Sequence, residues 1–267
     1  MLREITLGQY YPADSPIHKL DPRTKLFTTM IYIISIFCFK GPAAFVVITV
    51  ALAAVIYLSK VPFSYMVRGL KTIVFILIFA GILNLFMTPG RELVSFWKLT
   101  ISYEGAKNAS LMLFRMIYLI IGTSVMTLTT TPNQLTDGLE AALKPMKKIK
   151  VPVHEIAMMM SIALRFIPIL IEETDKIMKA QMARGADFES GGLIKKTKAM
   201  IPLLVPLFVS AFRRANDLAL AMEARCYSGG EGRTKMLPLK YENRDRITYV
   251  ISIVYLVAIC VLRRFPF

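Results

Sequence analysis

The stretch Ala43-Ala-Phe-Val-Val-Ile-Thr-Val-Ala-Leu-Ala-Ala-Val-Ile-Tyr-Leu58 runs for sixteen residues (43 to 58) without a charge. With its flanking residues it approaches the roughly 20 residues that a bilayer-spanning helix requires. Four further apolar runs cover 26–39, 72–87, 111–128 and 247–262. The chain of 267 residues is 55% hydrophobic with a mean hydropathy of +0.53, which is typical of a membrane protein. We therefore predict an all-α integral membrane protein with about five transmembrane helices.

The basic residues indicate how these spans are oriented. The net charge of +15 resembles that of a nucleic-acid-binding protein, but Lys and Arg concentrate before residue 26, at 59–71 and within 129–246. Basic loops stay on the cytoplasmic side of a membrane. We expect contact with membrane lipid and no nucleic-acid partner. The predicted parts are a membrane domain at 1–130 with about four spans, a cytoplasmic domain at 131–246 and a C-terminal transmembrane helix at 247–267.

Two long helical patterns, at about 153–184 and 195–225, dominate the predicted cytoplasmic part. Each begins with a nearly apolar half and continues as a charged half. Apolar residues at helical spacing follow the whole second pattern, which predicts one continuous packing seam: Ile201, Leu204, Val205, Phe208, Ala211, Phe212, Ala215, Leu218, Ala219 and Met222. Two more transmembrane spans are the alternative. Arg165 and the short apolar lengths favour amphipathic helices that leave the membrane surface.

The two patterns end alike, in Gln181-Met-Ala-Arg184-Gly-Ala-Asp187 and Met222-Glu-Ala-Arg225-Cys-Tyr-Ser228. Small neighbours allow each helix end to enter a groove, where the guanidinium can bind a carboxylate or backbone carbonyls. The alternative is a basic residue that only complements the helix dipole. Because the device occurs twice, we predict two similar contacts with a partner present in two copies, made by Ala183, Arg184, Gly185, Ala224, Arg225 and Cys226.

Opposite charges occupy equivalent positions before the two endings. Glu172 and Glu173 align with Arg213 and Arg214. If the helices cross near these residues, the four side chains form an ion cluster that braces the pair. Two separate solvated faces of opposite charge are an equally good interpretation.

A second motif precedes the first apolar run: Leu20-Asp21-Pro22-Arg23-Thr-Lys25-Leu26. Asp21 can cap a helix that has Pro22 in its first position. Arg23 and Lys25 then hold its cytoplasmic end. Together with the paired Ala-Arg endings, this string resembles the T components of energy-coupling factor (ECF) transporters, the EcfT or CbiQ-like family. The resemblance covers most of the chain, with Cys226 standing where a residue such as Gly or Ser is expected.

The resemblance implies a non-catalytic coupling subunit of an importer for vitamins or other micronutrients. The subunit would lie in the plasma membrane of a prokaryote, with 131–246 as its cytoplasmic coupling domain. Its partners would be two ABC-type ATPase subunits and a membrane-embedded, substrate-binding S component. Each arginine motif would enter a groove of one ATPase, and ATP-driven closure of the ATPase pair would move the long helices and reorient the S component.

Two other classes of protein were weighed. An intramembrane enzyme requires acids or a nucleophile with a base, and the five apolar runs contain no Asp or Glu. A stand-alone transporter or permease, the remaining alternative, predicts repeats among the spans or polar pore residues. Cys38, Cys226 and Cys260 have no paired spacing and form no cluster with His18 or His154. We therefore predict no catalytic residues, no metal site and no cofactor.

Overall fold

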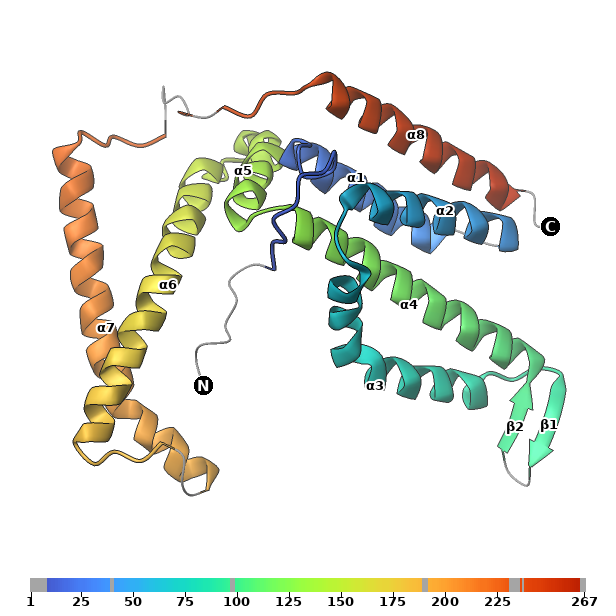
Figure 1. Cartoon of the computed structure of the whole chain (residues 1–267), viewed down its shortest axis with the longest axis horizontal. Coiled ribbons are helices and arrows are strands. Elements are labelled where there is room, and N and C mark those ends of the chain that lie inside the picture. The colour runs from blue at the N-terminus through green and yellow to red at the C-terminus, as the bar shows by residue number, and fades with distance from the viewer. Residues whose placement is uncertain are drawn as a thin grey trace. The chain divides into compact units, whose positions relative to one another are not determined.

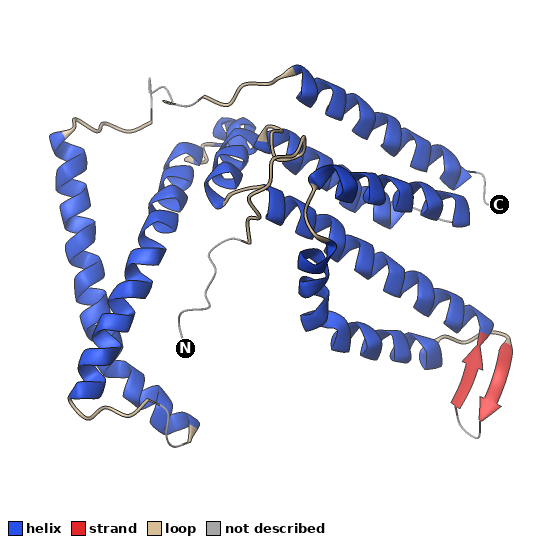
Figure 2. Ribbon diagram, viewed as in Figure 1, coloured by secondary structure: helices blue, strands red, loops and turns tan. Residues whose placement is uncertain are grey.

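The computed structural model describes residues 9–38, 41–96, 99–188, 192–230, 236 and 238–264. Within these ranges helices make up nearly all of the regular structure (Figures 1 and 2). In chain order the elements are α1 (Pro22–Cys38), α2 (Pro42–Ser59), α3 (Phe63–Met87), β1 (Glu92–Phe96), β2 (Leu99–Ser102), α4 (Tyr103–Thr129), α5 (Pro132–Leu143), the 3₁₀ helix η2 (Lys144–Ile149), α6 (Val153–Ala183), α7 (Leu193–Ala224) and α8 (Asn243–Arg264). The predicted all-α class is confirmed.

The chain divides into two compact units, each described here by itself. One unit comprises Gly8–Gly138 and Leu239–Phe267, and it contains α1 to α4 and α8. The described part of the other unit lies within Leu139–Pro238 and contains η2, α6 and α7.

The first unit is a helical bundle whose apolar residues are buried in two clusters. Leu52, Met66 and Leu77 of α2 and α3 pack on Ile121 and Val125 of α4. The second cluster joins α1, α2 and α8 through Ile36, Ala44, Ile48 and Ile259. Much of the remaining apolar surface of these helices is exposed, which suits a bundle surrounded by lipid.

Polar side chains inside the bundle are hydrogen-bonded to neighbouring helices. The Tyr32 hydroxyl of α1 donates to the Tyr118 carbonyl of α4 at 2.8 Å. The Tyr118 hydroxyl lies 2.9 Å from Thr49 Oγ1 of α2. Ser35 of α1 and Tyr255 of α8 form a third pair at 2.9 Å. Each of these hydroxyls thus has a partner, as an apolar surrounding requires.

The N-terminal motif ties three helices together at one end of the bundle. Asp21 Oδ1 accepts the Arg23 N–H at 2.9 Å, so it caps α1, which begins at Pro22. The ammonium group of Lys25 is buried and donates to the carbonyls of His18 (3.1 Å) and of Thr129 at the end of α4 (2.7 Å). The Asp21 N–H donates in turn to the buried carboxylate of Asp245 in α8 at 2.9 Å.

A short hairpin before α4 was not predicted. Strands β1 and β2 pair antiparallel, with Glu92 opposite Ser102 and Phe96 opposite Leu99. Ser102 ends the hairpin and begins the next helix, because its hydroxyl donates to the Thr88 carbonyl and accepts the Gly105 N–H. The hairpin holds the end of α3 close to the beginning of α4.

Three of the described helices are long and apolar enough to cross a membrane: α4, α6 and α8. Two shorter apolar segments lie at Ala43–Ser59 and Ile73–Met87. The first of the five predicted spans corresponds to α1, which has only seventeen residues. Among the described residues, α1 is neither one of the three long apolar helices nor one of the two shorter apolar segments. Helix α6, for which we favoured an amphipathic interpretation, satisfies the criteria for a span by length and composition.

Candidate functional site

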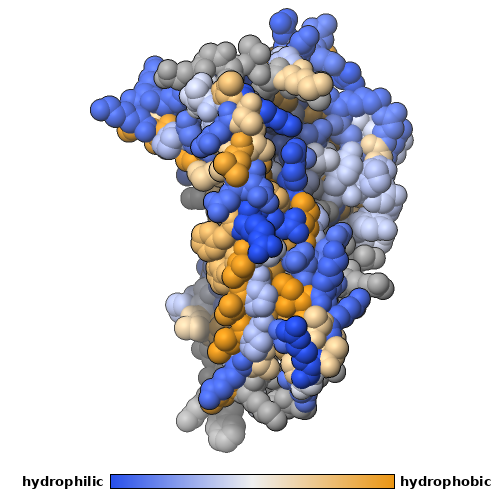
Figure 3. Space-filling view, turned by 90° about the vertical axis from the view of Figure 1, so that its left-hand side faces the viewer, coloured by the Kyte–Doolittle hydropathy of each residue, from blue (hydrophilic) through white to orange (hydrophobic). Residues whose placement is uncertain are grey.

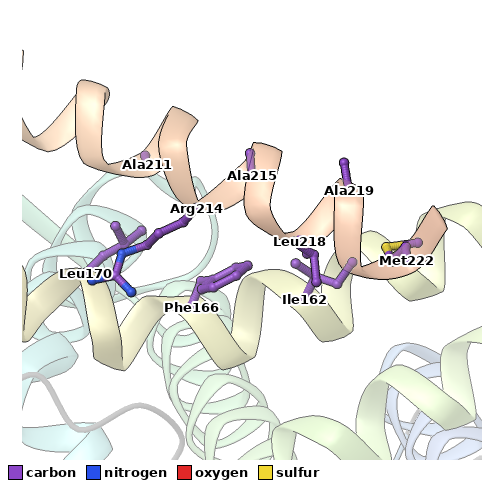
Figure 4. A pocket seen from close by; sticks show the side chains of 9 residues that line it. All are labelled: Ile162, Phe166, Leu170, Ala211, Arg214, Ala215, Leu218, Ala219 and Met222. Atoms are coloured by element: carbon purple, nitrogen blue, oxygen red, sulfur yellow. The ribbon is translucent and has the colours of Figure 1, made fainter. Parts of the chain in front are cut away.

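Helices α6 and α7 pack against each other in antiparallel orientation. Gln181 in the last turn of α6 contacts Pro202, early in α7, through its side-chain amide. Farther along the pair, α6 and α7 line an open apolar groove of about 280 Å³, shown in Figure 4. Its lining residues are Ile162, Phe166 and Leu170 of α6 and Ala211, Arg214, Ala215, Leu218, Ala219 and Met222 of α7.

The predicted seam of α7 divides into two parts. Its second part, from Ala211 to Met222 without Phe212, lines the groove against α6. Its first part stays exposed: the exposed fractions of Val205, Phe208 and Phe212 are 59%, 60% and 70%. A band of hydrophobic residues is visible among hydrophilic ones on the side of the molecule where α7 lies (Figure 3). Helix α6 thus covers only the second part of the predicted seam.

The first arginine ending closes α6 with a Schellman motif. Arg184 is the C-cap, and Gly185 follows in the left-handed region at φ 88°. The Gly185 N–H donates to the Met182 carbonyl at 2.9 Å, and the Ala186 N–H donates to the Gln181 carbonyl at 3.0 Å. These are the two bonds that define this helix termination.

The second arginine ending repeats the same motif at the end of α7. Arg225 is the C-cap, and Cys226 takes the left-handed position at φ 55°. The Cys226 N–H donates to the Glu223 carbonyl at 2.8 Å, and the Tyr227 N–H donates to the Met222 carbonyl at 3.0 Å. At the left-handed position the two motifs differ, because Cys226 has a Cβ where the first motif has glycine.

All six residues of the two endings are exposed: Ala183, Arg184, Gly185, Ala224, Arg225 and Cys226. Neither guanidinium forms an ion pair or hydrogen bond with the described residues. Nothing lies within 4 Å of the position that a Cβ on Gly185 would take. Each helix therefore ends in a strong planar hydrogen-bond donor that is open to a binding partner.

One ion pair of the proposed cluster connects the two helices. Arg214 Nη2 donates to Glu173 Oε2 at 3.2 Å, with 37% and 27% of the two side chains exposed. Glu172 and Arg213 are exposed, and neither forms an ion pair with the described residues. The structure thus brings together two of the four predicted side chains.

A proline creates a second contact between the helices. Pro206 has no N–H, so it cannot donate to the carbonyl four residues earlier, that of Pro202. Gln181 Nε2 of α6 donates to this carbonyl at 3.4 Å. The contact holds the turn of α6 that precedes Arg184 against α7.

Comparison with known proteins places the chain in a family. The family model CbiQ, described as cobalt transport protein, matches residues 13–236. The chain is 54% identical over 263 residues to a protein of Clostridium kluyveri (98% of this chain, 96% of the relative). It is 52% identical to one of Ruminiclostridium cellulolyticum (96% of each) and 47% identical to one of Bacillus subtilis (97% and 98%).

All three relatives carry the name energy-coupling factor transporter transmembrane protein EcfT. Their similarity extends over both units, so it includes the bundle and both arginine endings. The resemblance seen in the sequence motifs is confirmed: this chain belongs to the CbiQ family and, within it, to the EcfT proteins, the transmembrane components of energy-coupling factor transporters.

Proposed function

We propose that this chain is the non-catalytic coupling subunit of an ECF-type importer, and that its two arginine endings dock onto two ABC-type ATPase subunits. The observation that carries the proposal is the repetition of one exposed helix ending, Ala-Arg followed by a left-handed residue, on both members of an antiparallel pair. ATP hydrolysis is assigned to the ATPase subunits.

The arrangement of the two endings suits a partner with two-fold symmetry. In α6, Arg184 lies eleven residues after Glu173, and in α7, Arg225 lies eleven residues after Arg214. We call each of these two helix segments an arm. At 1.5 Å per residue, each arm is about 16 Å long. Because the helices are antiparallel, the endings point in opposite directions and are related by an approximate two-fold rotation. A symmetric dimer of ATPases presents two equal grooves related in the same way.

The chemistry of the endings supports tight docking at each groove. The alanines and Gly185 add little bulk, so a helix end can approach a groove closely. The guanidinium then binds a carboxylate or several carbonyl oxygens inside it. Removal of an arginine buried in this way costs about 2–5 kcal/mol of binding free energy.

The remaining parts of the chain are assigned by the same proposal. The bundle of α1 to α4 and α8 anchors the subunit in the plasma membrane, and residues 131–246 face the cytoplasm. The exposed apolar half of α7, from Ile201 to Phe212, contacts membrane lipid or a membrane-embedded S component that binds a vitamin or another micronutrient. Closure of the ATPase pair moves both arginine endings, and α6 and α7 transmit this motion to the S component.

Copurification of the ATPase subunits tests the proposal. We compare the unaltered chain with the double variant Arg184→Glu/Arg225→Glu, both coexpressed with the ATPase subunits. A matched control, Lys179→Glu/Lys198→Glu, reverses two exposed charges on the same helices away from the endings. We expect the arginine variant to lose the ATPases and the control to keep them, with equal amounts of each variant in the membrane fraction. Retention of the ATPases by the arginine variant would overturn the proposal.

A further inference from the structure

The segment after the second arginine ending returns to the beginning of α6. Beyond Cys226 the chain continues through Gly229, which has a φ of 100°, to Gly230 (Figure 1). Gly230 lies directly against the imidazole of His154, in the first turn of α6. A Cβ on Gly230 would lie 2.3 Å from His154 Cδ2 and 2.7 Å from Cγ. Such distances do not occur between packed atoms, so only glycine fits here without displacement of the ring.

The imidazole is also held from its other side. His154 Nδ1 lies 3.1 Å from Glu140 Oε1 of α5. Both side chains are largely covered, with 25% of His154 and 20% of Glu140 exposed. Val153, the preceding residue, is 2% exposed and fixes this turn of α6 in the unit. His154 therefore joins three segments: α5, the beginning of α6 and the segment that follows Arg225.

The glycines of the segment after the first arginine ending have no such contact. Gly185 and Gly192 both face open space, with no atom within 4 Å of an added Cβ. The contact described above for the Arg184 ending comes before the motif, from Gln181 to the Pro202 carbonyl. The two endings share one backbone geometry, and the contact between Gly230 and His154 belongs to the Arg225 ending.

We infer that His154 is a positioning residue for the Arg225 ending: held by Glu140, it packs against Gly230 and fixes the four residues that connect Gly230 to Arg225. A binding segment ordered before docking loses less conformational entropy when it binds. His154 therefore strengthens ATPase docking at Arg225 and leaves docking at Arg184 unchanged. The inference rests on the proposed function, and it assigns the His154 contact to one of the two docking ends.

A set of crossed substitutions tests the inference in the full chain, reconstituted in nanodiscs. The dissociation constant for the purified ATPase pair is measured for His154→Ala and Gly230→Ala, each in three backgrounds: unaltered, Arg184→Ala and Arg225→Ala. Gly192→Ala is the matched control, because its added Cβ meets nothing and its φ of −71° is accessible to alanine. The melting temperature of each variant reports whether the fold is intact.

We expect both substitutions to weaken binding by about tenfold in the unaltered chain and in the Arg184→Ala background, where docking depends on Arg225. In the Arg225→Ala background they should change binding by less than about twofold. Equal weakening in both backgrounds, or no weakening in folded variants, would overturn the positioning role while leaving the docking function in place. If neither arginine substitution weakens binding, the docking function itself is overturned.

Discussion

Glu173 of α6 and Arg214 of α7 form an ion pair at 3.2 Å midway between the two arginine endings. The pair lies at the point where two 11-residue arms meet, and its Arg214 lines the apolar groove together with Leu170 and Ala211. Because of this position, the ion pair favours one alignment of α6 along α7. A shift of either helix by one turn would separate the two charges by about 5.4 Å.

Removal of this ion pair should loosen the helix pair by a modest amount. Because both side chains are partly exposed, we expect a coupling free energy of about 0.5–1 kcal/mol between Glu173→Ala and Arg214→Ala. The measurement is a double-mutant cycle on the free energy of unfolding. The exposed pair Glu242–Arg244 is the control and should give a coupling energy near zero. Equal coupling in the two cycles would show that Glu173–Arg214 is an ordinary surface pair.

The left-handed positions of the two helix ends predict opposite effects for reciprocal substitutions. Gly185→Ala places a Cβ at φ 88° and should lower the free energy of unfolding by about 1 kcal/mol. Cys226→Gly removes a Cβ at φ 55° and should raise it by about 0.5–1 kcal/mol. Thermal unfolding of the two variants measures both changes. Gly192→Ala, at φ −71°, serves as the control; a loss of stability in Cys226→Gly would contradict the interpretation.

Asp245 should be a strong determinant of stability, although it belongs to neither sequence motif. Its carboxylate is 1% exposed and accepts the N–H groups of Asp21 and Glu242, each at 2.9 Å. Asp245→Ala leaves both donors without this acceptor, and we expect a loss of about 2–4 kcal/mol. Asp217→Ala, at an exposed position of α7, should cost less than about 0.5 kcal/mol. Equal melting temperatures for the two variants would refute the role of Asp245.

Acidification should weaken the segment before α1 through His18. Burial, partly offset by the hydrogen bond to the Tyr11 carbonyl, lowers the pKa of His18 below its usual value near 6.5. In the neutral imidazole of His18, Nε2 carries the proton, because it lies 3.0 Å from the Tyr11 carbonyl oxygen, which can only accept a hydrogen bond. Nδ1 therefore accepts a hydrogen bond from the Ser15 hydroxyl at 2.6 Å. The unfolded chain then binds more protons than the folded chain as the pH falls below about 6.5.

Stability should therefore decrease as the pH falls through the lowered pKa of His18. Melting temperatures between pH 7.5 and pH 5 measure the effect in the unaltered chain and in His18→Gln. The variant should lose less of its melting temperature over this interval. Parallel pH curves would show that His18 is not the group responsible.

Much of the fold follows from local sequence signals. Apolar runs mark α2, α4 and α8, and Asp21 with Pro22 marks the beginning of α1. The two Ala-Arg endings coincide with the last residues of α6 and α7, because a small or left-handed residue after the arginine stops a helix. These features depend on neighbours in the chain, so they can be predicted from the sequence.

Contacts between distant segments could not be predicted in this way. Nothing in the sequence around Asp245 indicates that it binds the Asp21 backbone, 224 positions away. The contact of Gly230 with His154 depends on the path of the chain after α7, which no periodicity encodes. The sequence does not show where α6 and α7 cross, so it could not show which charged side chains would meet. Of the predicted cluster of Glu172, Glu173, Arg213 and Arg214, Glu173 and Arg214 form an ion pair.

The prolines of α7 make its stiffness unequal along its length. Pro202 and Pro206 remove two consecutive backbone hydrogen bonds from its first half, whereas the nineteen positions from Pro206 to Arg225 contain no further proline. The part of α7 between Arg225 and the crossing with α6 should therefore transmit a force applied at Arg225 without bending. Bending should concentrate in the exposed apolar half of α7, which contains Pro202 and Pro206. The flexible part of the helix thus lies next to the surface assigned to the S component and far from Arg225.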